Sequence, residues 1–404
     1  MGFSKITQSR AFCMSDACRT YDCIVVGGGA AGLCLGVHLA KLQSQKGPCL
    51  ILERRSQYVD DRSWCFWENP NEISWIDRIV SKQWWHWEIS GCEEEVDHRA
   101  VNRPYCYVRS SDFYQSACSL IKQSNDVNLQ TGVEVSEISD SGGVCLVRTD
   151  HGDYRAKHVI DARPAVSLSP DPSGLLQIFV GSEISFSKPM FDPRRAVLMG
   201  NLNADDRAVW FQYVLPLDAH RALIEETAFA SEWIEADELD RRLKVSIQNL
   251  AGGQTMDILR HEKGVIPMQS TPPQQRGTSR ILRAGLAGGA VRASTGYALR
   301  RIDKWAKQCA AQLGAGRPPC GAYSGTVVER SLDRIFLRAV RANLSRAPEF
   351  FLKMAKGTTG DQFAAFLTGS TDPRVLFPVI SRMPKRPFLA AATQNWIGPS
   401  HASS

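Results

Sequence analysis

A short, almost wholly apolar run at residues 21–26 (YDCIVV) is the first regular pattern along the chain. Such a run predicts a strand that is buried on both faces of a parallel sheet. The segment LCLGVHLAKL that follows has helical spacing, and a second apolar run, CLILE, occupies residues 49–53. The order strand, turn, helix, strand predicts a βαβ unit.

Further apolar patterns in the middle of the chain predict a second sheet. They cover residues 175–189, 195–200 and 208–230, and an antiparallel sheet covered by helices is the economical arrangement for them. The final hundred residues carry mostly helical patterns, such as SLDRIFLRAVRANL at 331–344. We find no internal repeat and no low-complexity linker.

The turn of the predicted βαβ unit reads GGGAAG, and Gly27, Gly29 and Gly32 satisfy the GxGxxG pattern. The first glycine allows a tight turn, the second admits a pyrophosphate, and the third lets helix and strand pack closely. The pyrophosphate would lie at the helix N-terminus, beside Ala30 and Ala31, where free N–H groups favour an anion. Glu53, at the end of the second strand, would accept hydrogen bonds from ribose hydroxyls. The unit therefore predicts dinucleotide binding.

A second glycine-rich segment, RAGLAGGAVRASTGYALRRI, lies far downstream at residues 283–302. We interpret it as a strand, a turn and a helix that starts near Thr295. Gly288, Gly289, Thr295 and Gly296 could bring backbone amides against a flavin or phosphate, although an ordinary glycine-rich loop would have the same composition. Two glycine-rich ends favour FAD over NAD and leave the middle of the chain for a substrate domain.

Two adjacent carboxylates, Glu225 and Glu226, interrupt the apolar run ALIEETAFA at residues 222–230. Successive side chains of a strand face opposite sides, so one glutamate should point into the apolar interior. Desolvation raises the pKa of a buried carboxyl group and keeps a proton available for a general acid. The alternative is an edge strand whose glutamates are solvated or paired with arginine.

Tryptophan is concentrated between residues 64 and 87, where six occur: Trp64, Trp67, Trp75, Trp84, Trp85 and Trp87. Their ring faces could line an apolar or cation-stabilising cavity, with Trp64 and Trp67 the first candidates. Plain packing is the alternative for most of the six.

Composition and charge narrow the possible partners. The chain of 404 residues is 43% hydrophobic and 22% charged, and its net charge of +6 is spread out, which does not suggest nucleic acid. Its twelve cysteines form no CxxC pair and no zinc-like cluster, so we expect free thiols in a reducing cytoplasm and no metal site. No apolar stretch is long enough to span a bilayer. Residues 1–20 are expected to be a disordered leader.

Membrane contact remains possible through the predicted helix at 331–344. Its pattern sets Arg330, Arg334, Arg338 and Arg341 along one face. A basic amphipathic helix can rest on anionic headgroups, but a surface helix packed on its own core has the same pattern.

The ordered motifs together resemble the flavin-dependent lycopene cyclase family of carotenoid biosynthesis, from about residue 20 to about 310. Besides the glycine fingerprint, the resemblance rests on DDRSWCFWE (60–68), RPYCYVRSSDFYQ (103–115), LLQIFVG (175–181), FDPRRAVLMG (191–200), FQYVLPLDAHRALIEETAFA (211–230), HEKGVIPM (261–268) and the STGY segment. The tryptophan block, the Glu-Glu-Thr segment and the GVIPM and STGY pair are specific in combination.

The resemblance implies an α/β fold: a Rossmann-like FAD-binding domain of the glutathione-reductase type, an inserted antiparallel-sheet substrate domain and a helical C-terminal region. We expect the FAD-binding domain at 21–60, 100–165 and 280–315, the substrate domain at 61–99 and 166–279, and the helical region at 316–404.

The resemblance also implies reduced FAD, NADPH as electron donor and a hydrophobic polyene substrate. The enzyme would protonate a terminal double bond and close an ionone-type ring without net redox change. Glu226 is the expected acid, with Glu225 as the second choice. Arg54 joins the cofactor residues, and Trp64, Trp67 and Tyr297 are the expected substrate contacts. There are two alternatives. The first is an FAD- and NADPH-dependent monooxygenase or isoprenoid reductase, and the second is a noncatalytic flavin carrier at a membrane.

Overall fold

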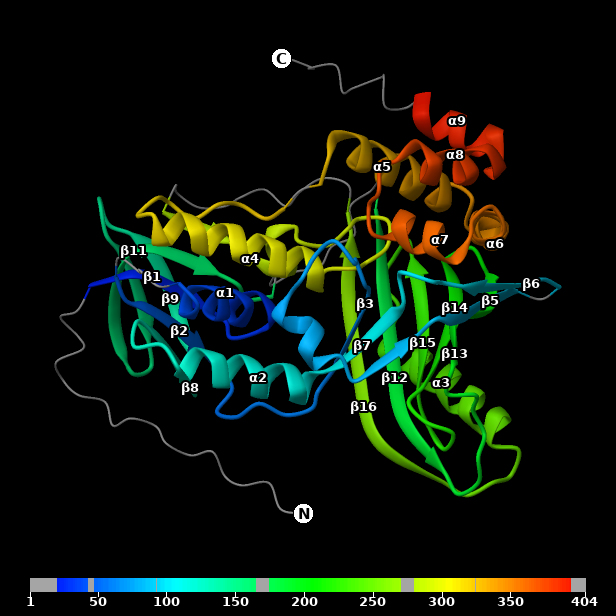
Figure 1. Cartoon of the computed structure of the whole chain (residues 1–404), viewed down its shortest axis with the longest axis horizontal. Helices are drawn as coiled ribbons and strands as arrows, with labels where there is room; N and C mark the ends of the chain where they lie inside the picture. Colours follow the sequence, from blue (N-terminus) through cyan, green and yellow to red (C-terminus); the bar gives the residue numbers. More distant parts are fainter. Residues whose placement is uncertain are drawn as a thin grey trace.

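The computed structural model of the protein describes residues 20–42, 47–91, 93–164, 174–269, 280–323 and 325–393. Apart from Thr20, which begins the first strand, the predicted leader lies outside these residues. Three sheets organise the described part of the chain, and helices cover them (Figure 1).

The first sheet contains the predicted βαβ unit. Its strand order is β8-β2-β1-β11-β10-β9, with β17 paired to β11. Parallel pairs join β1 (Thr20–Val26), β2 (Cys49–Glu53), β8 (Val127–Thr131), β11 (Gly152–Asp161) and β17 (Ile281–Arg283). β10 (Cys145–Thr149) runs antiparallel to both of its neighbours, β11 and β9 (Val135–Asp140). Both faces of β1 and β2 are buried, which explains their continuous apolar runs.

Three helices pack on this sheet: α1 (Ala30–Ala40), α2 (Ser110–Lys122) and α4 (Leu299–Gly314). Helix α1 lies against both α2 and α4, so it is buried almost all round. Gly36 permits this packing, because a Cβ there would lie 2.5 Å from Ile51 Cδ1. The glycine fingerprint is therefore held between rigid elements.

The second sheet lies beside the first and has the strand order β16-β12-β15-β14-β13-β5-β6. Its strands are β5 (His86–Gly91), β6 (Glu95–Arg99), β12 (Leu175–Phe186), β13 (Arg195–Ala204), β14 (Ala208–Pro216), β15 (Arg221–Ala230) and β16 (Met256–Met268). All neighbours are antiparallel except β13 and β5. The strands expected at 175–189, 195–200 and 208–230 are therefore confirmed, with a turn between β14 and β15.

A small third sheet, β3 (Ser63–Trp67), β7 (Tyr105–Arg109) and β4 (Lys82–Trp84), stands between the two larger sheets. The short helix η2 (Trp75–Ile79) connects β3 to β4. Most of the tryptophans of this region pack in the interior: the indole N–H of Trp84 donates to the Pro216 carbonyl, and that of Trp87 donates to His98 Nδ1. Packing is therefore their main role.

Opposite faces of the second sheet carry different helices (Figure 1). Helix α3 (Ala236–Ala251) buries the stripe Leu239, Leu243 and Ile247 against β12 and β15. The other face is covered by the C-terminal segment: α5 (Val327–Arg341), η4 (Leu344–Arg346), α6 (Ala347–Lys356), α7 (Gly360–Leu367), α8 (Pro373–Arg382) and α9 (Lys385–Thr393). None of the helices that the structure describes is long and apolar enough to cross a membrane.

Candidate active site

The glycine fingerprint forms the turn between β1 and α1. Gly27 has a φ of +107°, and a Cβ on Gly32 would lie 2.1 Å from the Gly27 carbonyl oxygen, so both positions require glycine. A Cβ on Gly29 would meet nothing within 4 Å, and no side chain caps the first turn of α1, which Ala30 and Ala31 begin. Open space and free N–H groups at a helix N-terminus fit a dinucleotide pyrophosphate.

At the end of β2, the carboxylate of Glu53 lies directly beside this turn. It accepts a hydrogen bond from the Gly28 N–H (2.7 Å) and pairs with Arg55, whose Nε lies 2.9 Å from Oε1. Desolvation raises the pKa of Glu53, but its bonds with Arg55 and Gly28 outweigh this, so the pKa stays below its usual value. Arg54, by contrast, has a side chain that is 76% exposed and faces Glu134. The structure therefore favours Arg55 over the predicted Arg54 as the arginine of the cofactor site.

The second glycine-rich segment lies next to the turn between β1 and α1. Its short helix η3 (Gly285–Gly288) approaches α1 so closely that a Cβ on Gly285 would lie 3.3 Å from Ala31 Cβ. Gly289 and Gly296 have φ values of +84° and +76°, and a Cβ on Gly288 would lie 2.5 Å from the Arg283 carbonyl oxygen. The hydroxyl of Thr295 is buried without a hydrogen-bond partner. The unpartnered Thr295 hydroxyl, in a loop whose glycines allow a close approach to the backbone, fits a bound flavin.

Glu225 and Glu226 point to opposite faces of β15, as strand alternation requires. Glu226 faces α3, where its Oε1 accepts hydrogen bonds from Ser246 (2.6 Å) and Gln212 (3.0 Å). It lines an outer cleft with Trp210, Arg241 and other polar residues. Desolvation raises its pKa, but α3 lies on the side of the second sheet opposite the C-terminal helices (Figure 1).

Glu225 faces the interior, toward the third sheet and the Gly296 loop. Its neighbour across the strands is Tyr213, and it accepts a hydrogen bond from the Thr227 hydroxyl (2.7 Å). Desolvation, followed by the charge of Glu262, raises the pKa of Glu225 to about 8. Its side chain is partly buried. Glu225, the second choice from the sequence, therefore fits the acid better than Glu226.

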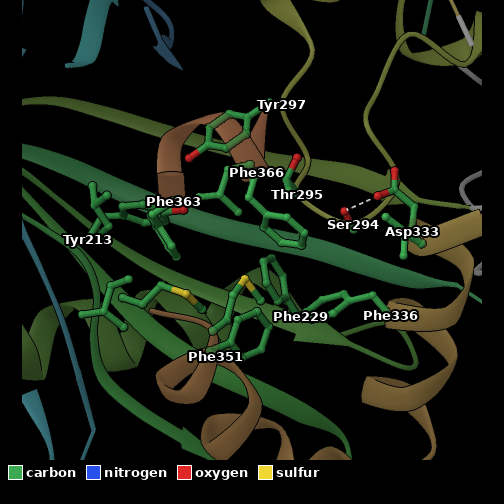
Figure 2. Close-up of a pocket in the computed structure, with 16 residues that line it drawn as sticks. Tyr213, Phe229, Ser294, Thr295, Tyr297, Asp333, Phe336, Phe351, Phe363 and Phe366 are labelled. Carbon is green, nitrogen blue, oxygen red and sulfur yellow. Dashed lines mark hydrogen bonds between the residues drawn. The ribbon is translucent and has the colours of Figure 1, made fainter. Parts of the chain in front are cut away.

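An aromatic pocket lies between the second sheet and the C-terminal helices (Figure 2), and Tyr213, the cross-strand neighbour of Glu225, is part of its wall. Tyr213 and Tyr297 stand at one end, and the Ser294 hydroxyl donates to Asp333 (2.7 Å) at the other. The walls are Ile89, Leu198, Met199, Phe229, Thr295, Leu332, Phe336, Phe351, Met354, Phe363, Phe366 and Leu367. Nearly all of these side chains are apolar, which suits a hydrophobic substrate and excludes water.

Of the predicted substrate contacts, only Tyr297 lines this pocket. Trp67 lies behind it, with ring centroids 4.7 Å from Tyr105 and 6.2 Å from Phe363. Trp64 packs on Phe113 (4.7 Å) in the core of the cofactor side and does not reach the pocket.

The C-terminal residues of the pocket could not be found from the sequence. Phe336, Phe351 and Phe363 look like the buried positions of ordinary amphipathic helices. Only Asp333 could have been noticed in the sequence, because an acidic residue among the apolar positions of a helix indicates a buried partner. In the structure it forms a buried ion pair with Arg292 of the glycine-rich segment (3.0 Å). Among the described residues, no group of histidine, cysteine and acidic side chains could hold a metal ion.

Comparison with known proteins identifies the family. The family model described as "Lycopene cyclase protein" matches residues 22–393. The chain belongs to the lycopene cyclase family. Within this family, the lycopene beta-cyclase of Pseudescherichia vulneris is 26% identical over 372 residues, which cover 88% of this chain and 93% of that protein. The lycopene beta cyclase of Synechococcus elongatus is also 26% identical, over 77% of each chain.

Solved structures share the fold of this lycopene cyclase family member. A geranylgeranyl bacteriochlorophyll reductase-like protein from Thermoplasma acidophilum aligns with a TM-score of 0.62 and 14% identity, over 92% of this chain and 98% of that chain. A flavin-dependent monooxygenase solved with FAD and substrate aligns with a TM-score of 0.56 and 13% identity, over 93% and 72%. At such identity the likeness concerns the fold alone, and the predicted α/β fold class is confirmed.

Proposed function

We propose that this protein is an FAD-dependent lycopene cyclase that closes an ionone-type ring at the end of a linear carotenoid, lycopene or a related polyene. The observation that carries the proposal is the place of Glu225, which lies on the inner face of β15 next to Tyr213 of the aromatic pocket and whose pKa is raised to about 8 by burial and by the charge of Glu262. A redox enzyme of the same fold has no need of such an acid.

The cofactor residues would be Gly27, Gly29, Gly32, Glu53 and Arg55, with the loop from Gly285 to Gly296 on the other side. Gly29 and the first turn of α1 leave room and free N–H groups for the pyrophosphate. When bound in its reduced form, with NADPH as the electron source, FAD would supply negative charge near the reacting end of the polyene. The reaction itself leaves the flavin unchanged.

Glu225 would transfer its proton to the terminal double bond, whose electron pair forms the new C–H bond. The neighbouring double bond then attacks the tertiary cation and closes the six-membered ring. Loss of a proton from the ring restores a double bond, so the product is an isomer of the substrate. Glu225 meets the requirement for a proton donor near neutral pH, because its pKa is about 8.

The pocket would hold the chain of the polyene and protect the cation. Tyr213, Tyr297 and Phe229 line the pocket, and the faces of aromatic rings attract a cation. Water would trap the cation as an alcohol, and the apolar lining keeps it out.

Expression in a lycopene-accumulating bacterial host, followed by pigment chromatography, tests this function. A cyclic carotene with no stoichiometric use of NADPH supports the cyclase. Unchanged lycopene removes this substrate, and product formed with one NADPH consumed per turnover indicates a reductase or monooxygenase instead.

We also propose that the protein contacts an anionic membrane surface, through α8 and α9 rather than through the predicted arginine face of α5. Arg341 and Arg330 on α5 donate to backbone carbonyls, the former to Gly174 and Ser231 and the latter to Gly325. On α8 and α9, by contrast, Phe377 and Leu389 are 73% and 63% exposed.

Three basic residues lie between these apolar positions in the sequence, and all are exposed: Arg382, Lys385 and Arg386. Exposed apolar residues among basic residues suit anionic lipid headgroups. The ring of Phe388, one residue before Leu389, lies 6.3 Å from that of Phe336, which lines the pocket. A carotenoid leaving the bilayer here would be only one side chain away from the pocket.

A further inference from the structure

A second buried carboxylate stands opposite Glu225 across one strand. Gly181 of β12 pairs with Glu225 of β15 on one side and with Glu262 of β16 on the other. A Cβ on Gly181 would lie 3.3 Å from Glu225 Cβ and 3.3 Å from Glu262 Cγ. Because this glycine has no side chain, nothing from the middle strand separates the two glutamates.

The two carboxyl groups have very different partners. Glu262 Oε2 accepts hydrogen bonds from Arg260 Nη1 (2.6 Å) and from the Ser63 hydroxyl (2.8 Å). Glu225 accepts from the Thr227 hydroxyl, and no cation contacts it in the described residues. When two carboxyl groups share a buried site, the one with the cation keeps the charge and the other keeps the proton.

The causes of the pKa shifts follow the same division. Desolvation raises the pKa of Glu262, while Arg260 and Ser63 oppose the rise. At Glu225 desolvation again comes first, but the charge of Glu262 adds to the rise. Glu262 is the member of the pair that contacts a cation, Arg260, so the proton is assigned to Glu225.

Other titratable groups near Glu225 do not replace this effect. Tyr213 from β14 and Cys65 from β3 have pKa values raised well above their ordinary values by burial, so both are neutral. Tyr297, from the glycine-rich segment, is neutral for the same reason. Glu226, on the opposite face of the same strand, adds only the last of the causes at Glu225. Among the charged groups, Glu262 has the largest effect on the pKa of Glu225.

We propose that Glu262 is a positioning residue: held ionised by Arg260 and Ser63, it keeps the catalytic proton on Glu225 across the gap at Gly181. This rests on the proposed function, in which Glu225 is the acid. Glu262 itself transfers no proton to the substrate in this scheme.

The test compares pH–rate profiles of the flavin-loaded enzymes Glu262→Gln and Glu262→Asp with the wild type. In Glu262→Gln the fall of the rate at alkaline pH should move to lower pH by roughly one unit, because the repelling charge is gone. Glu262→Asp keeps the charge and should restore the wild-type position. A rate that falls equally at every pH, with the alkaline limb unmoved, would mean a purely structural role and overturn the proposal.

An infrared difference spectrum tests the same point without altering Glu262. Wild type minus Glu225→Gln at pH 6.5 should show the loss of a neutral carboxylic acid band. Loss of a carboxylate band instead would put the proton on Glu262 and overturn the proposal. If Glu225→Gln still forms the cyclic product, the proposed acid is wrong; if it is inactive but the Glu262→Gln profile is unmoved, only the present inference fails.

Discussion

Replacement of Glu225 by glutamine should abolish ring closure while leaving the fold and flavin binding intact. The glutamine is nearly isosteric with glutamic acid and can still accept the hydrogen bond from Thr227, but it has no proton to donate. The perturbation therefore isolates the acid from its surroundings.

The expected magnitude follows from the environment of Glu225. With a pKa of about 8 against an ordinary 4.5, roughly nine-tenths of the side chains carry the proton at pH 7, compared with about one in 300 for an exposed glutamate. Loss of a general acid typically lowers the rate by about 10²–10⁴-fold. We expect a loss in this range, and we expect the wild-type rate to be flat below pH 8 and to fall above it.

The chain provides a matched control one residue away. Glu226→Gln makes the same chemical change on the opposite face of β15, where the carboxylate bonds Ser246 and Gln212. The assay is the initial rate of carotenoid cyclisation with reduced flavin, with the flavin content of each variant measured by absorbance. An inactive Glu226→Gln together with an active Glu225→Gln would refute the assignment.

Three further predictions test other parts of the structure. Glu225→Gln should raise the free energy of unfolding at pH 7 by about 3 kcal/mol, and the melting temperature with it, because folding of the wild type must take up a proton at this pH. This gain in stability should develop above pH 4.5, grow up to about pH 8 and be absent at pH 4. Gly29→Ala should fold, since its Cβ meets no protein atom, but it should lose flavin because the Cβ fills the space left for the cofactor. Gly32→Ala should destabilise even the flavin-free protein, because its Cβ meets the Gly27 carbonyl. Circular dichroism and flavin titration separate the two effects, and wild-type flavin binding by Gly29→Ala would contradict the site. Phe377→Asp with Leu389→Asp should reduce flotation with anionic liposomes severalfold, while Val245→Asp, an exposed apolar position on α3, should not; equal flotation of all three proteins would exclude the α8–α9 surface.

Local patterns were sufficient for the elements that hold the cofactor. The strands at 21–26 and 49–53 have the predicted bounds within one residue, because apolar runs and glycine requirements act over short distances. The helix between them begins at Ala30, three residues before the segment LCLGVHLAKL, and ends at Ala40. The helix expected near Thr295 begins later, at Leu299. Gly296 has a φ of +76°, which is not helical, so the residues between Thr295 and Leu299 form a loop.

The choice between adjacent residues could not be made in the same way. Alternation dictates that Glu225 and Glu226 face opposite sides, but which side carries the pocket depends on where α3 and the C-terminal helices pack. The same holds for Arg54 and Arg55 after β2. Glu262 lies in a segment whose sequence gives no sign that Gly181 stands between it and Glu225, since that relation exists only across three strands.

Segments that follow the dinucleotide site in the sequence complete the wall of the aromatic pocket. Every element of the first sheet and its helices precedes residue 315, whereas Phe336, Phe351 and Phe363 come later. On the ribosome, the dinucleotide site can thus form and fill while the reaction chamber is still open to water. A nascent or truncated chain that ends before α5 would hold its coenzyme but have nowhere to keep a carbocation dry.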